Sequence, residues 1–227
     1  MNDADFRRAM TAMPLLEGVS AELLDEVLDA TFPVALARGD SAVTHLEDGR
    51  DVYFIVSGEM RVALVSPSGR PLTYQVLGAG DMFGEVAAID HLPRSASVTA
   101  DTEAMLGRMP GPRFLGLIES STEFALLVLK RMAQLNRRLS VRLLEYHAYD
   151  VKARVCAELL RLGEARSWDT FSITDGDMAS RVGTTRENVS RIHGELRKLK
   201  LIERNRSQTR VLQPEMVDAF IEGHEFS

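Results

Sequence analysis

The spacing of apolar residues predicts three kinds of structure along this chain. Residues 15–31 place apolar side chains three and four positions apart, as in a helix, and Ser20 stands where it can cap that helix. Between about residues 33 and 110, short apolar runs alternate with Gly, Pro, Asp and Ser, and turn signals recur about every ten residues. This texture predicts a β-sandwich or jelly-roll barrel, with a hairpin tip at residues 66–69 (SPSG).

Helical spacing returns at about residue 112 and continues for roughly forty residues. A helix of that length is too long for a lone surface helix. Its apolar stripe suits pairing with a second copy of the chain, and the alternative is a core helix within one chain. A break is expected near residues 147–152, followed by a second helical segment and a compact helical module. The stripe consists of Met132, Leu135, Leu139, Leu143 and Tyr146.

Composition narrows the class of protein. The 227 residues carry a net charge of −6 and a single cysteine, Cys156, which excludes an internal disulfide and a four-thiolate cluster. The sequence has no run of about 18 apolar residues and no secretory signal pattern, so a cytoplasmic protein is expected. It has no nucleophile elbow, metal-ligand cluster or Walker loop, so an enzyme is not expected. Three histidines are candidates for haem ligation without any supporting local pattern: His45, His91 and His147.

Residues 82–97 (MFGEVAAIDHLPRSAS) carry the residue types that a cyclic phosphodiester requires. Glu85 can accept a hydrogen bond from a sugar hydroxyl, and the planar guanidinium of Arg94 can bind a buried phosphate. The alternative is a surface ion pair between these two side chains. Backbone amides can close on a phosphate only beside small side chains, which are present as Gly84, Ala87, Ala88 and Ala96.

Residues 173–202 predict two helices joined by a tight turn. Thr174 can cap the first helix, and Gly183 supplies the left-handed residue of the turn. Thr184 and Glu187 have the spacing of a capping box for the second helix. Two helices in this arrangement form a helix-turn-helix, and the alternative is a small helical bundle with a solvated basic face.

The charge distribution favours a nucleic-acid interface at this motif. Residues 181–210 contain nine basic and three acidic side chains, although the whole chain is acidic. Arg can read guanine in the major groove, and Glu can accept a hydrogen bond from cytosine. The exposed N-terminal face of the second helix carries Arg186, Glu187, Ser190 and Arg191. Residues 201–212 predict a two-stranded wing whose arginines are placed for phosphates, namely Arg204, Arg206 and Arg210.

Taken in order, these segments resemble the CRP/FNR family of bacterial transcription regulators, from about residue 15 to residue 222. Residues 82–97 are also similar to the phosphate-binding cassette of eukaryotic cyclic-nucleotide domains. The resemblance implies an α+β fold in three parts. These are an N-terminal β jelly-roll cyclic-nucleotide-binding domain (1–111), a dimerisation helix region (112–149) and a C-terminal winged helix-turn-helix (150–227).

The resemblance also implies roles for particular residues in a homodimer that a cyclic nucleotide switches allosterically. Glu85 would bind the ribose 2′-hydroxyl, Arg94 the cyclic phosphate, and Ser95 the phosphate or the purine. The other residues implied at the pocket are Gly84, Val86, Ala87, Ala96, Val62, Tyr74 and Gln75. Arg186, Glu187 and Arg191 match the family's base-reading positions, with Thr184, Thr185 and Ser190 beside them. The implied partners are a palindrome of TGTGA-like DNA half-sites, a second copy of this chain, and RNA polymerase.

The sequence departs from the family pattern where the base of the nucleotide would bind. The cAMP-binding pattern presents Thr-Ser from the long helix to the adenine amino group, whereas the aligned pair here is Leu139 and Ser140. Leucine cannot form that hydrogen bond. We expect cAMP as the effector, with cGMP as the alternative, and no metal, haem or iron–sulfur cluster. A further alternative is a ligand-independent DNA-binding protein of the same fold.

Overall fold

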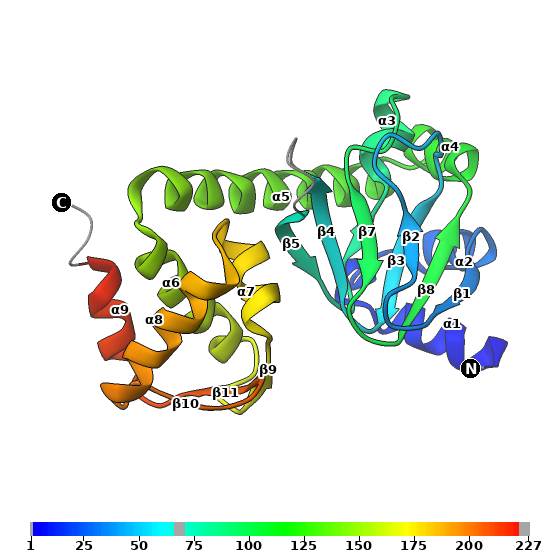
Figure 1. The fold of residues 1–227 in the computed structure, drawn as a ribbon. Helices are drawn as coiled ribbons and strands as arrows, with labels where there is room; N and C mark the ends of the chain where they lie inside the picture. The colour runs from blue at the N-terminus through cyan, green and yellow to red at the C-terminus, as the bar shows by residue number, and fades with distance from the viewer. Residues whose placement is uncertain (1, 66–70, 223–227) are drawn as a thin grey trace. The chain divides into compact units, whose positions relative to one another are not determined.

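The structure is a computed structural model that describes residues 2–65 and 71–222 (Figure 1). The predicted hairpin tip at 66–69 lies outside the described residues. The chain divides into two compact units, and each is treated by itself below. One unit consists of Met1–Leu64 with Tyr74–Asn136, and the other consists of Val65–Thr73 with Arg137–Ser227. The mixed α+β fold class is confirmed, with strands concentrated in the first unit and a helical domain in the second.

Two four-stranded sheets form the β-sandwich that the alternating texture predicts. The first sheet has the order β1 (Phe32–Leu36), β8 (Ala104–Met109), β3 (Val52–Ser57) and β6 (Met82–Phe83). The second sheet has the order β2 (Ser41–Val43), β7 (Ser97–Ala100), β4 (Met60–Val65) and β5 (Pro71–Leu77). Sequence neighbours are often not sheet neighbours, as expected of a jelly roll.

Strand β3 is apolar at nearly every position because both of its faces are buried. Successive side chains on a strand point to opposite faces. Ile55 therefore enters the core between the two sheets, where Val62 and Leu106 also lie. Val52 and Phe54 enter a second core on the outer face of the first sheet.

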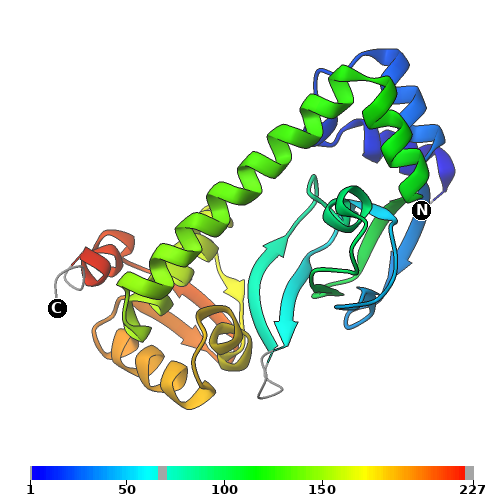
Figure 2. The ribbon, with the colours of Figure 1, turned by 90° about the horizontal axis from the view of Figure 1, so that it is seen from above.

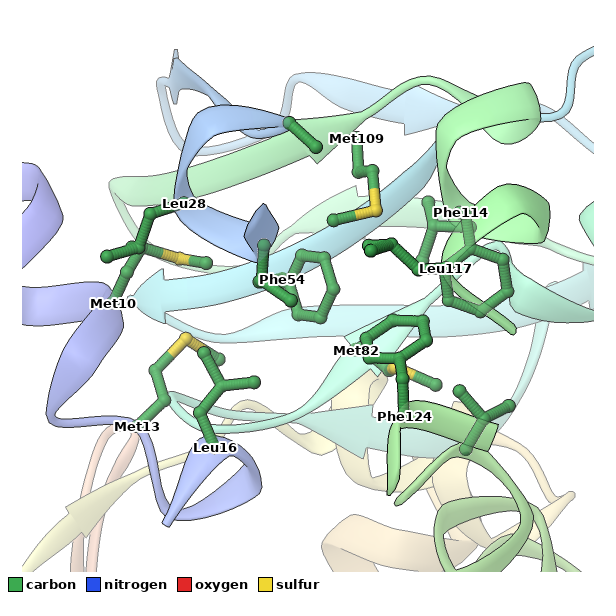
Figure 3. Packing of buried hydrophobic residues seen from close by; sticks show 14 of the residues in the cluster. Met10, Met13, Leu16, Leu28, Phe54, Met82, Met109, Phe114, Leu117 and Phe124 are labelled. Carbon is green, nitrogen blue, oxygen red and sulfur yellow. The ribbon is translucent and has the colours of Figure 1, made fainter. Parts of the chain in front are cut away.

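Helices cover this outer face and complete the second core (Figure 3). Ser20 caps α2 as predicted, because its Oγ accepts from the amide of Leu23 at 3.4 Å. In Figure 3, Phe54 and Met82 lie among side chains from helices, such as Met10 of α1 and Phe124 of α5. The helical elements of this unit are α1 (Asp3–Thr11), η1 (Pro14–Leu16), α2 (Ala21–Asp29), α3 (Glu85–Asp90), α4 (Gly111–Ser120) and the start of α5 (Thr122–Ala148).

The expectation of one unbroken helix from about residue 112 is wrong. Ser121 adopts an extended conformation between α4 and α5, and its Oγ accepts from the amide of Phe124 at 3.2 Å. The break allows Phe114 of α4 and Phe124 of α5 to meet edge to face, with ring centroids 5.5 Å apart. Periodicity alone missed this change of direction, since both helices keep an apolar face.

The second unit joins the end of α5 to a helical domain with a small sheet (Figure 2). The predicted break is confirmed, because α5 ends at Ala148 and Asp150 caps the next helix through the amide of Ala153 at 2.7 Å. Leu159, Ile192 and Leu196 are among the apolar side chains of its core. Its elements are α6 (Val151–Glu164), β9 (Phe171–Ser172), α7 (Asp175–Val182), α8 (Arg186–Lys198), β10 (Ile202–Asn205), β11 (Gln208–Val211) and α9 (Pro214–Glu222).

The predicted apolar stripe on α5 does not form one uniform face. Met132 packs against the core of the first unit, and the Tyr146 hydroxyl donates to the Arg181 carbonyl at 3.1 Å. Leu139 and Leu143 are exposed. Further exposed apolar side chains of α5 are Leu126, Leu129, Val141 and Leu144. The exposed apolar side chains of α5 therefore coincide only in part with the predicted stripe.

Candidate functional site

A left-handed glycine positions the first candidate site. Gly84 joins β6 to α3 with φ of 91°. A Cβ at this position would lie 2.6 Å from the Asp51 carbonyl oxygen and 2.8 Å from Nη1 of Arg94. Glycine is therefore needed both for the backbone conformation and for the close approach of Arg94.

Arg94 is buried, with 4% of its surface exposed. Its Nη1 donates to the Gly84 carbonyl at 3.1 Å and its Nη2 donates to the Asp51 carbonyl at 2.8 Å. Among the described residues it forms no ion pair with a carboxylate, and burial lowers its pKa. This guanidinium has no carboxylate in direct contact, although Asp51, Glu47 and Glu85 act on it at longer range, so an anion can pair with it directly.

Glu85 begins α3 beside this arginine and is also 4% exposed. Burial raises its pKa to about 7, although its own backbone amide and the charge of Arg94 act in the opposite direction. Tyr74 lies within electrostatic reach, since burial and then the charge of Glu85 raise the pKa of its phenol. The structure thus brings together the buried carboxyl of Glu85, the buried guanidinium of Arg94 and the phenol of Tyr74.

The remaining residues predicted at this site differ in their surroundings. Val62, Tyr74 and Ala96 belong to the core between the sheets, Ala87 is buried, Val86 is half-buried and Ser95 is exposed. Gln75 follows Tyr74 on β5, so the alternation of a strand places it on the opposite face from Tyr74. Leu139 and Ser140 are exposed on the part of α5 that belongs to the second unit.

Sequence reasoning missed four residues around Arg94. Tyr53 and Phe83 stack with centroids 5.0 Å apart, and Asp51 contributes a backbone carbonyl. A Cβ at Gly49 would lie 3.4 Å from Nε of Arg94. A backbone acceptor leaves no signal in residue type, so Asp51 could not have been identified, whereas Gly49 in the polar run EDGRD was a detectable turn signal.

The second candidate site is the helix-turn-helix formed by α7 and α8. Thr174 caps α7 as predicted, and Gly183 adopts φ of 67° in the turn. The predicted capping box of Thr184 with Glu187 is wrong. Thr185 caps α8 instead, and its Oγ1 accepts from the amide of Asn188 at 3.3 Å.

The N-terminal face of α8 presents the predicted polar side chains to the surface. Arg186, Glu187, Ser190 and Arg191 border one shallow hollow. Arg191 is 63% exposed and donates to Glu195 at 2.6 Å, one helical turn away. A solvated pair of this kind is weak, so Arg191 can exchange this partner for a base edge.

The wing forms as predicted, but one of its arginines points inward. Register pairs Arg204 with Thr209, which is fully buried. The Arg204 side chain is 7% exposed and donates to Asp175 at 2.8 Å. Alternation along β10 puts Arg204 on the same face as buried Ile202, so the structure does not support its predicted role as a phosphate contact. Arg206 and Arg210 are exposed.

Three further observations concern metal ligands, membrane-spanning helices and the single thiol. Residues 2–65 and 71–222 contain no group of three or more His, Cys, Asp or Glu side chains placed to hold a metal ion. Within the same ranges, every helix is too short or too polar to cross a bilayer. Cys156 is fully buried, and burial raises its thiol pKa to about 12.

Comparison with known proteins places both candidate sites within recognised domains. A model of the cyclic nucleotide-binding domain matches residues 33–121, and a model of the Crp-like helix-turn-helix domain matches residues 153–220. The chain is 28% identical over 184 residues to a CRP-like cAMP-activated global transcriptional regulator of Mycobacterium tuberculosis, covering 78% of this chain and 82% of that protein. It is 27% identical over 187 residues to a cyclic AMP receptor protein of Thermus thermophilus, covering 81% of this chain and 85% of that protein.

Solved structures share the fold at lower sequence identity. The c-di-GMP responsive global regulator CLP of Xanthomonas campestris superposes with a TM-score of 0.75 at 17% identity, covering 85% of this chain and 99% of that chain. Similar folds thus occur in proteins that respond to different effectors.

Proposed function

Because this chain belongs to the CRP/FNR family of transcription regulators, we propose that it is a homodimeric, sequence-specific DNA-binding protein switched by a cyclic nucleotide. We propose cAMP as the effector. The named relatives from M. tuberculosis and T. thermophilus are cAMP-activated or cAMP-binding proteins, and their similarity covers both domains.

The observation that carries the proposal is the buried guanidinium of Arg94. Its hydrogen-bond partners are two backbone carbonyls, so a phosphate would supply a negative charge in direct contact with it. A cyclic phosphodiester carries one such charge, which matches one arginine. Glu85, beside it, supplies an acceptor for a ribose hydroxyl once its carboxyl is ionised.

The proposed DNA contacts lie at the start of α8 and on the wing. Arg186, Glu187 and Arg191 would read base edges of TGTGA-like half-sites, while Arg206 and Arg210 would contact phosphates. A two-fold dimer would place two such helices about 34 Å apart, one turn of DNA. RNA polymerase is the proposed partner in transcription, and the cytoplasm is the proposed location.

The proposed dimer interface is the exposed apolar surface of α5. Leu129 and Leu143 are each 60% exposed in the single chain, and their exposure is costly in water. Pairing with a second α5 would bury them. Leu139 and Ser140 lie on the same helix, so base contacts there would bias the dimer directly.

A fluorescence anisotropy titration of a labelled duplex carrying two TGTGA-like half-sites tests the proposal. With cAMP present, we expect tight binding that weakens at least about tenfold without nucleotide, since coupling free energies of 1–3 kcal/mol are typical. If cGMP tightens DNA binding and cAMP does not, the effector is cGMP. Tight binding that no nucleotide alters would contradict the switch and leave a ligand-independent DNA-binding protein.

A further inference from the structure

A cluster of five charged side chains lies where the end of α5 meets α6 and α7, entirely within the second unit. Its centre is Glu158 of α6, whose side chain is 3% exposed. Oε2 of Glu158 accepts from Arg142 of α5 and from Arg161 of α6, each at 2.8 Å. Oε1 accepts from Arg181 of α7 at 3.1 Å. One carboxylate therefore connects three helices.

The cluster is closed by a second acid on α5. Glu145 is 7% exposed, accepts from Arg142 at 3.4 Å and pairs with Arg161. Burial alone would raise the pKa of Glu158, but the three guanidiniums more than compensate and lower it. Glu158 is therefore ionised at neutral pH, and each contact to it is a charge-assisted hydrogen bond.

Tyr146 and Arg154 add hydrogen bonds to backbone carbonyls between the same elements. The Tyr146 hydroxyl donates to the Arg181 carbonyl at 3.1 Å, and a Cβ at Gly183 would lie 2.9 Å from the Tyr146 ring. Arg154 donates to the carbonyls of Tyr149 and Val182, each at 3.0 Å. The α5–α6 corner and the turn of the helix-turn-helix are thus connected by side chains from both sides.

The stretch of α5 just before this cluster has different surroundings. Residues 136–141 are all exposed in the single chain, over more than one helical turn. The division between the two units also falls there, between Asn136 and Arg137. In contrast, Arg142, Glu145 and Tyr146 are buried or half-buried.

We propose that Glu158 is a positioning residue that clamps the last two turns of α5 to the helix-turn-helix, so that residues 142–148 and the DNA-reading helix move as one body. The α5–α6 corner at residues 148–151 belongs to the same body. The functional part of this inference rests on the proposed nucleotide switch. Leu139 and Ser140 lie less than one helical turn before Arg142, so a base bound there would act on this body through α5.

Hydrogen exchange on the intact protein without nucleotide tests the clamp independently of the switch. Peptides covering 143–148 should exchange as slowly as those of α6. Arg142→Gln should accelerate exchange at 143–148 by about tenfold or more, the effect expected of losing a charged hydrogen-bond partner. The matched control, Arg137→Gln on exposed α5, should leave those peptides unchanged, and Arg142→Lys should retain more protection than Arg142→Gln. Equal exchange in all three variants, or a native 143–148 segment that exchanges much faster than α6, would overturn the clamp.

A second measurement connects the clamp to function. In the anisotropy assay, Arg142→Gln should reduce the ratio of DNA affinities with and without cAMP several-fold, while affinity for cAMP stays unchanged because Arg142 is not a pocket residue. An unchanged ratio would contradict the positioning role. If the native protein shows no response to nucleotide, the proposed function fails, whereas the exchange experiment still decides the clamp. Glu158→Gln provides a stronger perturbation, with the reactivity of buried Cys156 as the test of folding.

Discussion

Replacing Glu85 by glutamine should stabilise the ligand-free protein at neutral and alkaline pH. The carboxyl of Glu85 is 4% exposed, and burial raises its pKa from 4.5 to about 7. The folded state therefore favours the neutral acid. In the unfolded chain the carboxyl ionises from pH 4.5 upward, so the native protein loses stability as pH rises from about 4.5 to 7 and no further above that.

The size of the effect follows from the same two pKa values. A shift from 4.5 to about 7 corresponds to about 3 kcal/mol of unfolding free energy at pH 8, and to about 1 kcal/mol at pH 5. Glu85→Gln removes the titration and keeps the shape of the side chain. The unfolding free energy of the variant, measured relative to that of the native protein, should therefore increase by about 2 kcal/mol from pH 5 to pH 8.

Urea unfolding at both pH values, followed by far-UV circular dichroism, measures this difference. Circular dichroism is preferable to tryptophan fluorescence, because the single tryptophan, Trp168, lies in the second unit. The control is Glu22→Gln on the exposed surface of α2, which shows how removal of an exposed carboxylate changes the unfolding free energy. The reasoning is refuted if the difference in unfolding free energy between Glu85→Gln and the native protein is the same at pH 5 and pH 8.

Three further predictions concern ligand and DNA binding. Affinity for cAMP should fall by up to about tenfold per pH unit below pH 7, because the ionised carboxylate of Glu85 is a much stronger acceptor for the ribose hydroxyl than the neutral acid; calorimetry that finds no pH dependence would argue against that contact. Gly84→Ala should cost about 1–3 kcal/mol of stability, since φ is 91° and the new Cβ would contact the Asp51 carbonyl; an unchanged urea midpoint would show that the turn relaxes freely. Arg191→Ala should relax discrimination at one base pair by about 1–3 kcal/mol, whereas Arg206→Ala should weaken all duplexes alike; the reverse pattern in anisotropy titrations would exchange the two roles.

Local signals in the sequence were sufficient to predict several helix caps, turns and strands. Ser20 and Thr174 cap helices as predicted, because an N-cap depends only on residues within one turn. Gly183 adopts the left-handed conformation for the same kind of reason. Turn residues and alternating apolar runs were sufficient to predict the β-sandwich.

Features that depend on tertiary contacts were not predictable in the same way. The break at Ser121 follows from the meeting of two aromatic rings in one core, and the inward turn of Arg204 follows from strand register. Either of two neighbouring threonines could occupy the N-cap position of α8, and in the structure Thr185 occupies it rather than Thr184. Glu158 also pairs with Arg142 and Arg181, which lie 16 and 23 positions away, and no local pattern indicates these two contacts.

The phosphate role of Arg94 is the central claim, and a calorimetric titration of the intact protein with cAMP tests it most directly. The native protein should bind saturably, and Arg94→Gln should lose about ten- to a hundredfold in affinity, the range for a charged hydrogen-bond partner. Arg38→Gln, a matched change at an exposed arginine, should bind as the native protein does. If Arg94→Gln binds cAMP as tightly as the native protein while remaining folded, the assignment of the pocket is contradicted.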